Sequence, residues 1–116
     1  MTTSLGQLGE NLAAQYLKQH GLTILDRNIR SQYGEIDLIV RDQDCLIFVE
    51  VKTRSSHKFG LPQAAVTPKK LEKITKVCQS YRQNHPKLPA AERIDVIAIT
   101  NTQPTPTIEW IKNVLI

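Results

Sequence analysis

Three charged residues interrupt two apolar runs in the first half of the chain. Asp37 stands within residues 34–40, and Glu50 and Lys52 stand within residues 45–52. Carboxylate oxygens are hard ligands that select Mg²⁺ or Mn²⁺ over zinc, and Mg²⁺ needs only one or two of them beside waters and a substrate phosphate. A metal so held activates water for attack on a phosphodiester, and a neighbouring lysine can orient that water and balance charge on phosphorus. These residue types suit phosphodiester hydrolysis if the fold brings them together.

The two apolar runs are typical of an antiparallel hairpin, because both are rich in β-branched residues and the polar residues 41–44 between them include turn-forming Asp. We expect Val40 to face Cys45 across this turn. Directly opposed residues share one face of a hairpin, so one face is wholly apolar. Its members are Ile36, Leu38, Val40, Cys45, Ile47 and Val49. The other face gathers Glu35, Asp37, Glu50 and Lys52 at one end.

In this register Glu50 lies opposite Glu35 and diagonal to Asp37, and diagonal neighbours are about 7–8 Å apart. One divalent ion can bridge that gap. Without a counter-ion the carboxylates would repel one another, which raises their pKa values. The alternative is a strand end in solvent, with Lys52 in an ordinary cross-strand ion pair. The position of Glu50-Val51-Lys52 directly after an apolar run favours a site.

The composition predicts one globular domain covering residues 1–116, since 41% of the chain is hydrophobic and 22% is charged. The first residues lack the basic and apolar regions of a signal peptide, and no apolar run reaches membrane-spanning length. We therefore expect a cytosolic protein with no membrane association. The net charge of +4, with a pI near 9.2, suits a polyanionic partner and equally suits plain solubility.

The cysteines and histidines are predicted to have no metal role. Cys45 and Cys78 lack the close spacing of a redox pair or a zinc site, and we expect both to be small core residues. His20, His57 and His85 are too scattered in the sequence to form a ligand cluster.

The expected elements follow the order α-β-β-β-α-β-β. A helix begins at a Ser4 cap and stops at Gly21, and a second begins at Thr67 and Pro68. Strands are expected at residues 22–30, 34–40, 45–52, 93–100 and 107–111, with a mobile loop over 53–60. The second helix connects two parallel strands, 45–53 and 93–100. Spacing alone favours an exposed Glu10 near the first helix N-terminus.

Three short motifs in this order resemble the YraN family. They are Leu8-Gly9-Glu10, Gly34-Glu35-Ile36-Asp37-Leu38-Ile39 and Phe48-Val49-Glu50-Val51-Lys52-Thr53-Arg54. That family consists of predicted endonucleases related to archaeal Holliday-junction resolvases, within the PD-(D/E)XK nuclease superfamily. The resemblance implies an α/β, restriction-endonuclease-like fold with a mixed central sheet flanked by helices. It also implies Mg²⁺- or Mn²⁺-dependent cleavage of structured or branched DNA.

The resemblance assigns roles to individual residues. It implies that Glu10 joins Asp37, Glu50 and the Val51 carbonyl at the metal, with Lys52 as a further catalytic residue. Ile36 departs from the proline of the superfamily pattern. Accessory residues are Glu35 and Gln63, the latter in a segment similar to one near the family's site.

A basic surface beyond the site is expected to contact the sugar-phosphate backbone. Its members are Arg54, His57, Lys58, Lys69, Lys70 and Lys73. A homodimer would supply the paired cuts that a junction requires, with residues 107–111, Trp110 and the tail 114–116 as the interface; Trp110 and the tail could instead fold back onto the core. Alternatives to a nuclease are a non-cutting nucleic-acid-binding module and a structural partner in a larger complex. Retention of Asp37, Glu50 and Lys52 together favours catalysis.

Overall fold

The protein is an α/β domain with five strands and two helices in the part of the chain that its structure, a computed structural model, describes: residues 4–55, 66–101 and 104–114. The elements are α1 (Leu5–Gln19), β1 (Thr23–Ser31), β2 (Gly34–Asp42), β3 (Cys45–Arg54), α2 (Pro68–Gln83), β4 (Ala91–Thr100) and β5 (Thr107–Ile111). This order confirms the expected α-β-β-β-α-β-β sequence. Within the described residues, no helix has the length and apolar character needed to cross a membrane.

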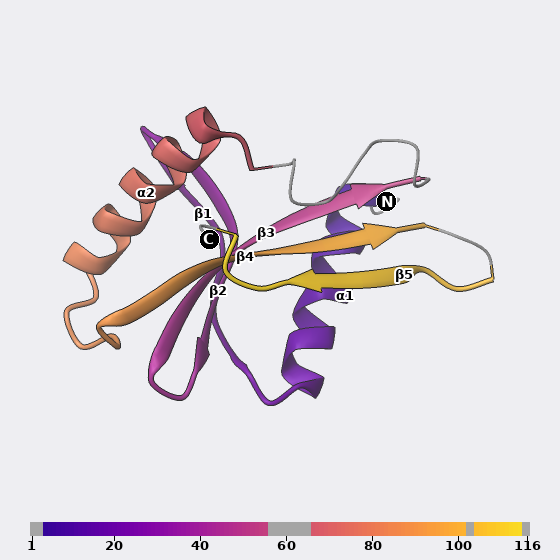
Figure 1. The fold of residues 1–116 in the computed structure, drawn as a ribbon, viewed down its shortest axis with the longest axis horizontal. Coiled ribbons are helices and arrows are strands. Elements are labelled where there is room, and N and C mark those ends of the chain that lie inside the picture. The colour runs from indigo at the N-terminus through magenta and orange to yellow at the C-terminus, as the bar shows by residue number, and fades with distance from the viewer. Residues whose placement is uncertain (1–3, 56–65, 102–103, 115–116) are drawn as a thin grey trace.

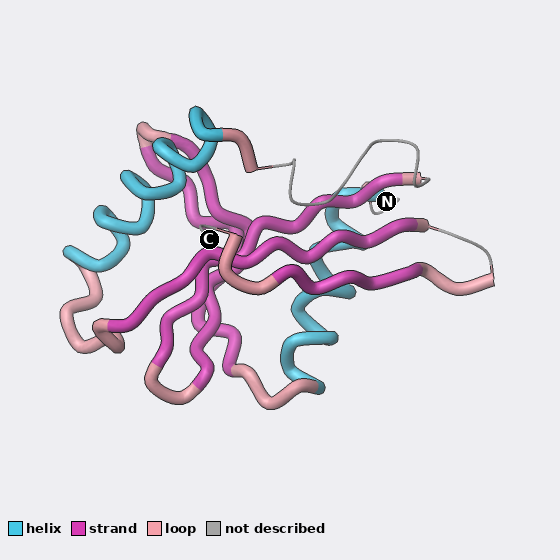
Figure 2. Tube along the Cα trace, in the orientation of Figure 1, coloured by secondary structure: helices cyan, strands magenta, loops and turns pink. Residues whose placement is uncertain are grey.

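The strands form one mixed sheet in the order β1-β2-β3-β4-β5. Only β3 and β4 are parallel, and the other neighbours are antiparallel. The parallel pair requires a crossover, and α2 makes it, as expected from the sequence. Figures 1 and 2 show the strands as one twisted layer with α1 and α2 on either side of it.

Each helix covers one apolar face of the sheet. The core beneath α1 includes Leu17, Leu38, Val40, Ile47, Val49 and Ile97, and the core beneath α2 includes Ile36, Ile39, Phe48, Ile74, Val77 and Tyr81. Because β2, β3 and β4 contribute to both cores, their sequences are apolar on both faces. The two cores hold the sheet from both sides and fix the ends of β2 and β3, where the charged residues lie.

Both helices begin at the caps that the sequence predicts. The Oγ atom of Ser4 accepts a hydrogen bond from the Gln7 N–H at 3.2 Å, and the Oγ1 atom of Thr67 accepts one from the Lys70 N–H at 3.2 Å. Pro68 is the first residue of α2, where its missing N–H removes no helical hydrogen bond. These caps determine where Glu10 and Lys70 fall along their helices.

The predicted hairpin is correct, but its predicted register is wrong by two residues. Val40 pairs with Ile47 and Asp42 pairs with Cys45, so the turn contains two residues instead of four. Two-residue turns match the twist of their strands and require a positive φ, and Gln43 adopts φ 50°. An even shift keeps Leu38 and Val40 on the same face as Val49 and Ile47.

The expected apolar face also differs at Ile36. The paired section of β2 and β3 ends at Leu38 and Val49. Ile36 lies beyond that point and packs in the core beneath α2, whereas Leu38 packs beneath α1. The separation of the two strands therefore ends the simple alternation that the sequence reading assumed.

Strand β3 continues further than expected, since Thr53 and Arg54 pair with Ile99 and Thr100 of β4. These two residues were expected to open a mobile loop. The remainder of that loop, beyond residue 55, lies outside the described residues.

The chain after β5 turns back across the sheet (Figure 1). The Val114 N–H donates to the Ile94 carbonyl at 2.8 Å, and Val114 packs against the core beneath α2. The Trp110 ring lies beside Tyr16 of α1 and beside His20, the C-cap of that helix, and its Nε1–H donates to Asp95. Both residues thus follow the fold-back alternative to the dimer interface, while residues 115 and 116 lie outside the described part.

Candidate functional site

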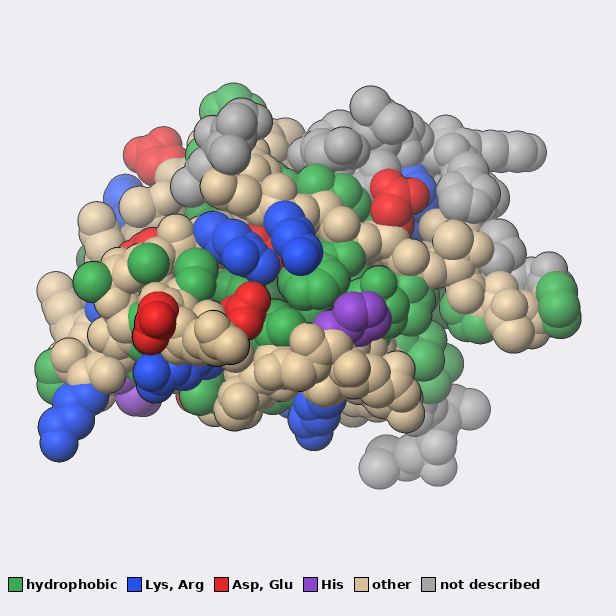
Figure 3. Space-filling model, turned by 60° about the horizontal axis from the view of Figure 1, so that its bottom comes forward, with side chains coloured by type: hydrophobic (Ala, Val, Ile, Leu, Met, Phe, Trp, Pro, Cys, Tyr) green, Lys and Arg blue, Asp and Glu red, His purple; other side chains and the backbone are tan. Residues whose placement is uncertain are grey.

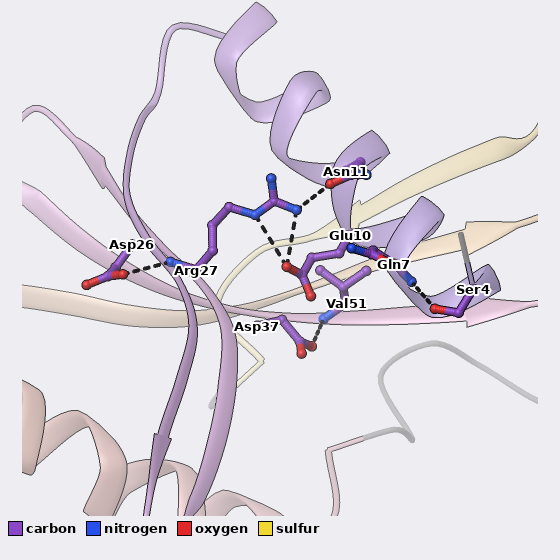
Figure 4. Close-up of polar contacts among 8 residues, drawn as sticks. All are labelled: Ser4, Gln7, Glu10, Asn11, Asp26, Arg27, Asp37 and Val51. Carbon is purple, nitrogen blue, oxygen red and sulfur yellow. Dashed lines mark hydrogen bonds and ion pairs between the residues drawn. The ribbon is translucent and has the colours of Figure 1, made fainter. Parts of the chain in front are cut away.

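The candidate site begins where β2 and β3 separate. The last backbone pair of these strands is Leu38 with Val49. Beyond it, the side chain of Asp37 connects β2 to β3. Its Oδ2 atom accepts a hydrogen bond from the Val51 N–H at 2.8 Å, as Figure 4 shows. This bond satisfies a backbone donor that has lost its strand partner, and it holds the Asp37 carboxylate in the fork.

A cavity of about 400 Å³ opens at this fork. Its lining includes Glu10 from α1, Asp37 from β2, and Glu50, Val51 and Lys52 from β3. The structure therefore brings together the residues that the sequence and the family resemblance assigned to the metal and to catalysis. Glu35 also lines this cavity, although its side chain is exposed and pairs with Arg30.

Glu10 is buried, with 9% of its surface exposed, so the interpretation from helical spacing alone was wrong. The Oε1 atom of Glu10 lies 3.2 Å from Nη2 of Arg27 and 3.3 Å from its Nε. The same Nη2 donates to Oδ1 of Asn11 (Figure 4). A buried carboxylate requires a charge partner, and β1 supplies it.

Gly9 explains how α1 approaches β3 closely enough to bury Glu10. A Cβ atom at residue 9 would overlap the Thr53 hydroxyl. Only glycine permits this contact without moving the helix or the strand, so the Gly9-Glu10 pair and Thr53 form one packing unit.

Glu50 is tied to the second helix. Its Oε1 atom lies 2.5 Å from Nζ of Lys70, and only 13% of the Glu50 side chain is exposed. A second cavity of about 430 Å³ adjoins the first, and Lys69, Lys70 and Lys73 line it together with Glu50. These three expected phosphate contacts therefore lie beside the carboxylates.

The pKa of Asp37 is raised from 3.8 to about 6, first by burial and next by the neighbouring charge of Glu50. Glu10 and Glu35 act in the same direction, while the hydrogen bond from the Val51 N–H lowers the pKa. Four acids therefore share one electrostatic environment. A cation at the fork would relieve this repulsion.

The donor set fits Mg²⁺ or Mn²⁺ in its chemistry, since every candidate ligand is an oxygen atom. Within residues 4–55, 66–101 and 104–114, however, no three His, Cys, Asp or Glu side chains converge closely enough to hold a metal ion. Glu10 and Glu50 instead contact Arg27 and Lys70. A metal would have to compete with these two cations for its ligands.

The remaining predicted site residues differ in exposure and position. Lys52 is exposed and reaches the first cavity. Arg54 is buried, with 7% of its surface exposed, and its Nε donates to the Thr100 hydroxyl, so it differs from the expected surface cation. His57, Lys58 and Gln63 lie outside the described residues.

Sequence reasoning missed Arg27 and Asn11 as partners in the site. Arg27 follows Glu10 by 17 residues along the chain, and no periodicity links a strand residue to a helix residue. Its only signal was a long cation in the otherwise half-apolar residues 22–30.

The raised pKa of Asp37 predicts a pH-dependent effect on stability. The unfolded chain loses this proton near pH 3.8 and the folded chain near 6, so the contribution of Asp37 to folding stability falls as pH rises through that window. Asp37→Asn should therefore stabilise the metal-free protein above pH 6 by about 1–2 kcal/mol, allowing for partial solvent screening. The difference should shrink toward pH 4. Urea unfolding in a chelator at several pH values measures it, and parallel pH profiles for the two proteins would contradict it.

The fold and the site define an α/β domain with an acidic fork beside a group of lysines. The chain belongs to the uncharacterised protein family UPF0102, whose model matches residues 9–99. Glu10, Asp37, Glu50 and Lys52 all lie within the matched region.

The relatives of this chain include UPF0102 proteins from Geobacter metallireducens and Dichelobacter nodosus. The first is 46% identical and covers 95% of this chain and 90% of its own length. The second is 43% identical and covers 98% of this chain and 90% of its own length. Among solved structures, SfsA from Pyrococcus furiosus in complex with Ca²⁺ matches with a TM-score of 0.36 and 14% identity, over 92% of this chain and 60% of that one.

Proposed function

We propose that this protein is a metal-dependent endonuclease that hydrolyses phosphodiester bonds of structured or branched DNA, on a restriction-endonuclease-like fold. The observation that supports this most is the single cavity lined by Glu10, Asp37, Glu50 and Lys52 at the fork of β2 and β3. Paired carboxylates with a lysine suit phosphodiester hydrolysis. Preference for branched DNA follows from the resemblance to junction resolvases.

Each residue has a distinct proposed role. Asp37, Glu50, the Val51 carbonyl and Glu10 would hold Mg²⁺ or Mn²⁺, which when bound supplies a polarised phosphoryl oxygen and an acidified water. Lys52 orients the attacking water and balances the charge that develops on the phosphate. Arg27 positions the Glu10 carboxylate, and Asn11 accepts a hydrogen bond from Arg27 that holds the guanidinium in place.

The proposed DNA surface lies on the α2 side of the fork. Lys69, Lys70 and Lys73 line the second cavity, beside Glu50. On the face drawn in Figure 3, Lys and Arg side chains are intermixed with Asp and Glu side chains, so the net charge of +4 does not mark that face as basic. His57 and Lys58 stay in the proposal as phosphate contacts, and Gln63 as an accessory residue. Arg54 would act indirectly, by holding β3 to β4.

A second candidate is a nucleic-acid-binding module of the same fold that does not cut. The ion pairs of Glu10 with Arg27 and of Glu50 with Lys70 favour it, because they neutralise two proposed ligands without any metal. A homodimer remains part of the nuclease proposal, since paired cuts need two sites, and the outer edge of β5 would be available to a second copy.

The experiment combines cleavage with metal binding. Labelled four-way junctions, flaps, nicked duplexes and RNA are incubated with Mg²⁺, Mn²⁺ or a chelator, and Mn²⁺ is titrated calorimetrically into wild type, Asp37→Ala and Asp44→Ala. Asp44 is an exposed acid of the same hairpin and serves as the matched control. We expect metal-dependent cleavage of a branched substrate, and loss of Mn²⁺ binding only in Asp37→Ala. DNA binding without metal binding or cleavage would establish the non-cutting module instead.

A further inference from the structure

Lys70 occupies the position of a counter-ion at a proposed metal ligand. Its Nζ lies 2.5 Å from Oε1 of Glu50, and the lysine side chain is 41% exposed whereas that of Glu50 is 13% exposed. The carboxylate is therefore fixed in the protein interior and the ammonium is the partner open to solvent. A divalent cation that binds Glu50 must share or displace this ammonium.

The side chain of Lys70 can move without its helix. The backbone is held by the cap, because the Lys70 N–H donates to the Thr67 hydroxyl. Beyond the backbone, lysine carries a flexible four-carbon stem with a compact charge. The ammonium can thus leave Glu50 while α2 stays in place.

A second location for the ammonium lies next to the first. Lys70 and Glu50 line both the cavity at the fork and the neighbouring cavity, whose other cations are Lys69 and Lys73. Within the described part of the chain, Lys69 and Lys73 have no ion-pair partner, and the first turn of α2 contains no acid. A group of like charges is stabilised beside an anion, and a backbone phosphate has the matching charge.

We infer that Lys70 is an exchangeable counter-ion: it neutralises Glu50 in the metal-free protein and transfers to a DNA phosphate when a divalent cation binds Glu50. The inference rests on the proposed function and adds a coupling between its two ligands. The cation frees a lysine for the phosphate, and the phosphate stabilises the freed lysine. Metal and DNA therefore bind cooperatively through this one side chain.

The test begins with metal alone. In Lys70→Met, which keeps the apolar stem without the charge, Mn²⁺ affinity measured by calorimetry should rise on the order of tenfold, because a positive charge within 4 Å of the ligand is removed. Lys69→Met is the matched control, since Lys69 lines the same cavity without contacting Glu50, and its Mn²⁺ affinity should stay within about twofold of wild type, as expected for a more distant and screened charge.

The second readout is the coupling between metal and DNA. Binding of a labelled junction is measured with and without Mn²⁺ in the Lys52→Ala background, to limit cleavage. Mn²⁺ should increase junction affinity, and Lys70→Met should remove most of this increase, while Lys69→Met should weaken junction binding equally with and without Mn²⁺.

The outcomes separate this inference from the proposed function. Equal Mn²⁺ affinity in wild type and Lys70→Met would overturn the exchange and leave the metal site intact. Weaker Mn²⁺ binding in Lys70→Met would also overturn it, because Lys70 would then support the site. Absence of Mn²⁺ binding from both proteins would remove the proposed function and the exchange together.

Discussion

Replacing Asp95 with alanine should destabilise the fold by about 3–5 kcal/mol, the cost typical of breaking a buried ion pair by removing one partner. Asp95 is fully buried, and its carboxylate accepts hydrogen bonds from Nε of Arg93 at 3.0 Å, Nε1 of Trp110 at 2.9 Å and the Asn113 N–H at 2.8 Å. Its removal leaves all three donors without this acceptor. Nη2 of Arg93 is already buried with no hydrogen-bond partner among the described residues, so the arginine charge would become still less compensated.

The matched control for Asp95 is Glu92, which also forms an ion pair from β4. Its Oε1 atom lies 2.7 Å from Nε of Arg82, but the Glu92 side chain is 41% exposed. Solvent-exposed pairs contribute about 0–1 kcal/mol, so Glu92→Ala should change stability little. Equilibrium unfolding in urea compares the two variants. Equal losses of stability in Asp95→Ala and Glu92→Ala would contradict the prediction that the buried ion pair stabilises the fold more than the exposed one.

The second large effect is expected at Lys52. Lys52→Ala should lower the single-turnover rate of junction cleavage by about 10²–10³-fold, the loss typical of removing one group that stabilises charge in the transition state. Its junction affinity should stay near that of wild type. The reason is position: Lys52 lines the cavity of the carboxylates, and it does not line the neighbouring lysine cavity.

Lys69→Ala provides the contrasting control, because Lys69 lines only the neighbouring cavity. It should weaken binding and lower the log–log salt slope by about 0.9 for one lost phosphate contact, with little change in rate at saturating enzyme. If junction affinity fell in parallel with rate in Lys52→Ala, Lys52 would be a phosphate anchor and not a catalytic residue.

Local features of the structure were predictable because they depend on neighbours in the sequence. Ser4 and Thr67 were identified as caps from residue type and position, and β5 was predicted with its observed limits. Leu38 and Val40 also lie on the predicted face of the hairpin, although the predicted register is wrong by two residues. A shift by an even number of residues leaves each side chain on the same face. The face of a residue was therefore easier to predict than its partner on the opposite strand.

The contacts within the site were not predictable in the same way. Asp95 lies in the predicted strand 93–100, and its partners Trp110 and Asn113 come from β5 and the residues after it. The pairing of Glu10 with Arg27 likewise joins a helix to a strand. Such contacts depend on how whole elements pack, and hydrophobic periodicity carries no information about them.

The sequence by itself determined the order of elements, the apolar faces, the caps and the acids and lysine that could do chemistry, because each follows from residue type and short spacing. Tertiary structure alone decided the hairpin register, the point where β2 leaves β3, and the cations that neutralise Glu10 and Glu50. The physical reason is that the pKa of a carboxylate depends on its burial and on the charges that other elements bring close to it. For Asp37, burial and neighbouring charges together raise the pKa to about 6. Most of the groups responsible lie on segments distant in the chain.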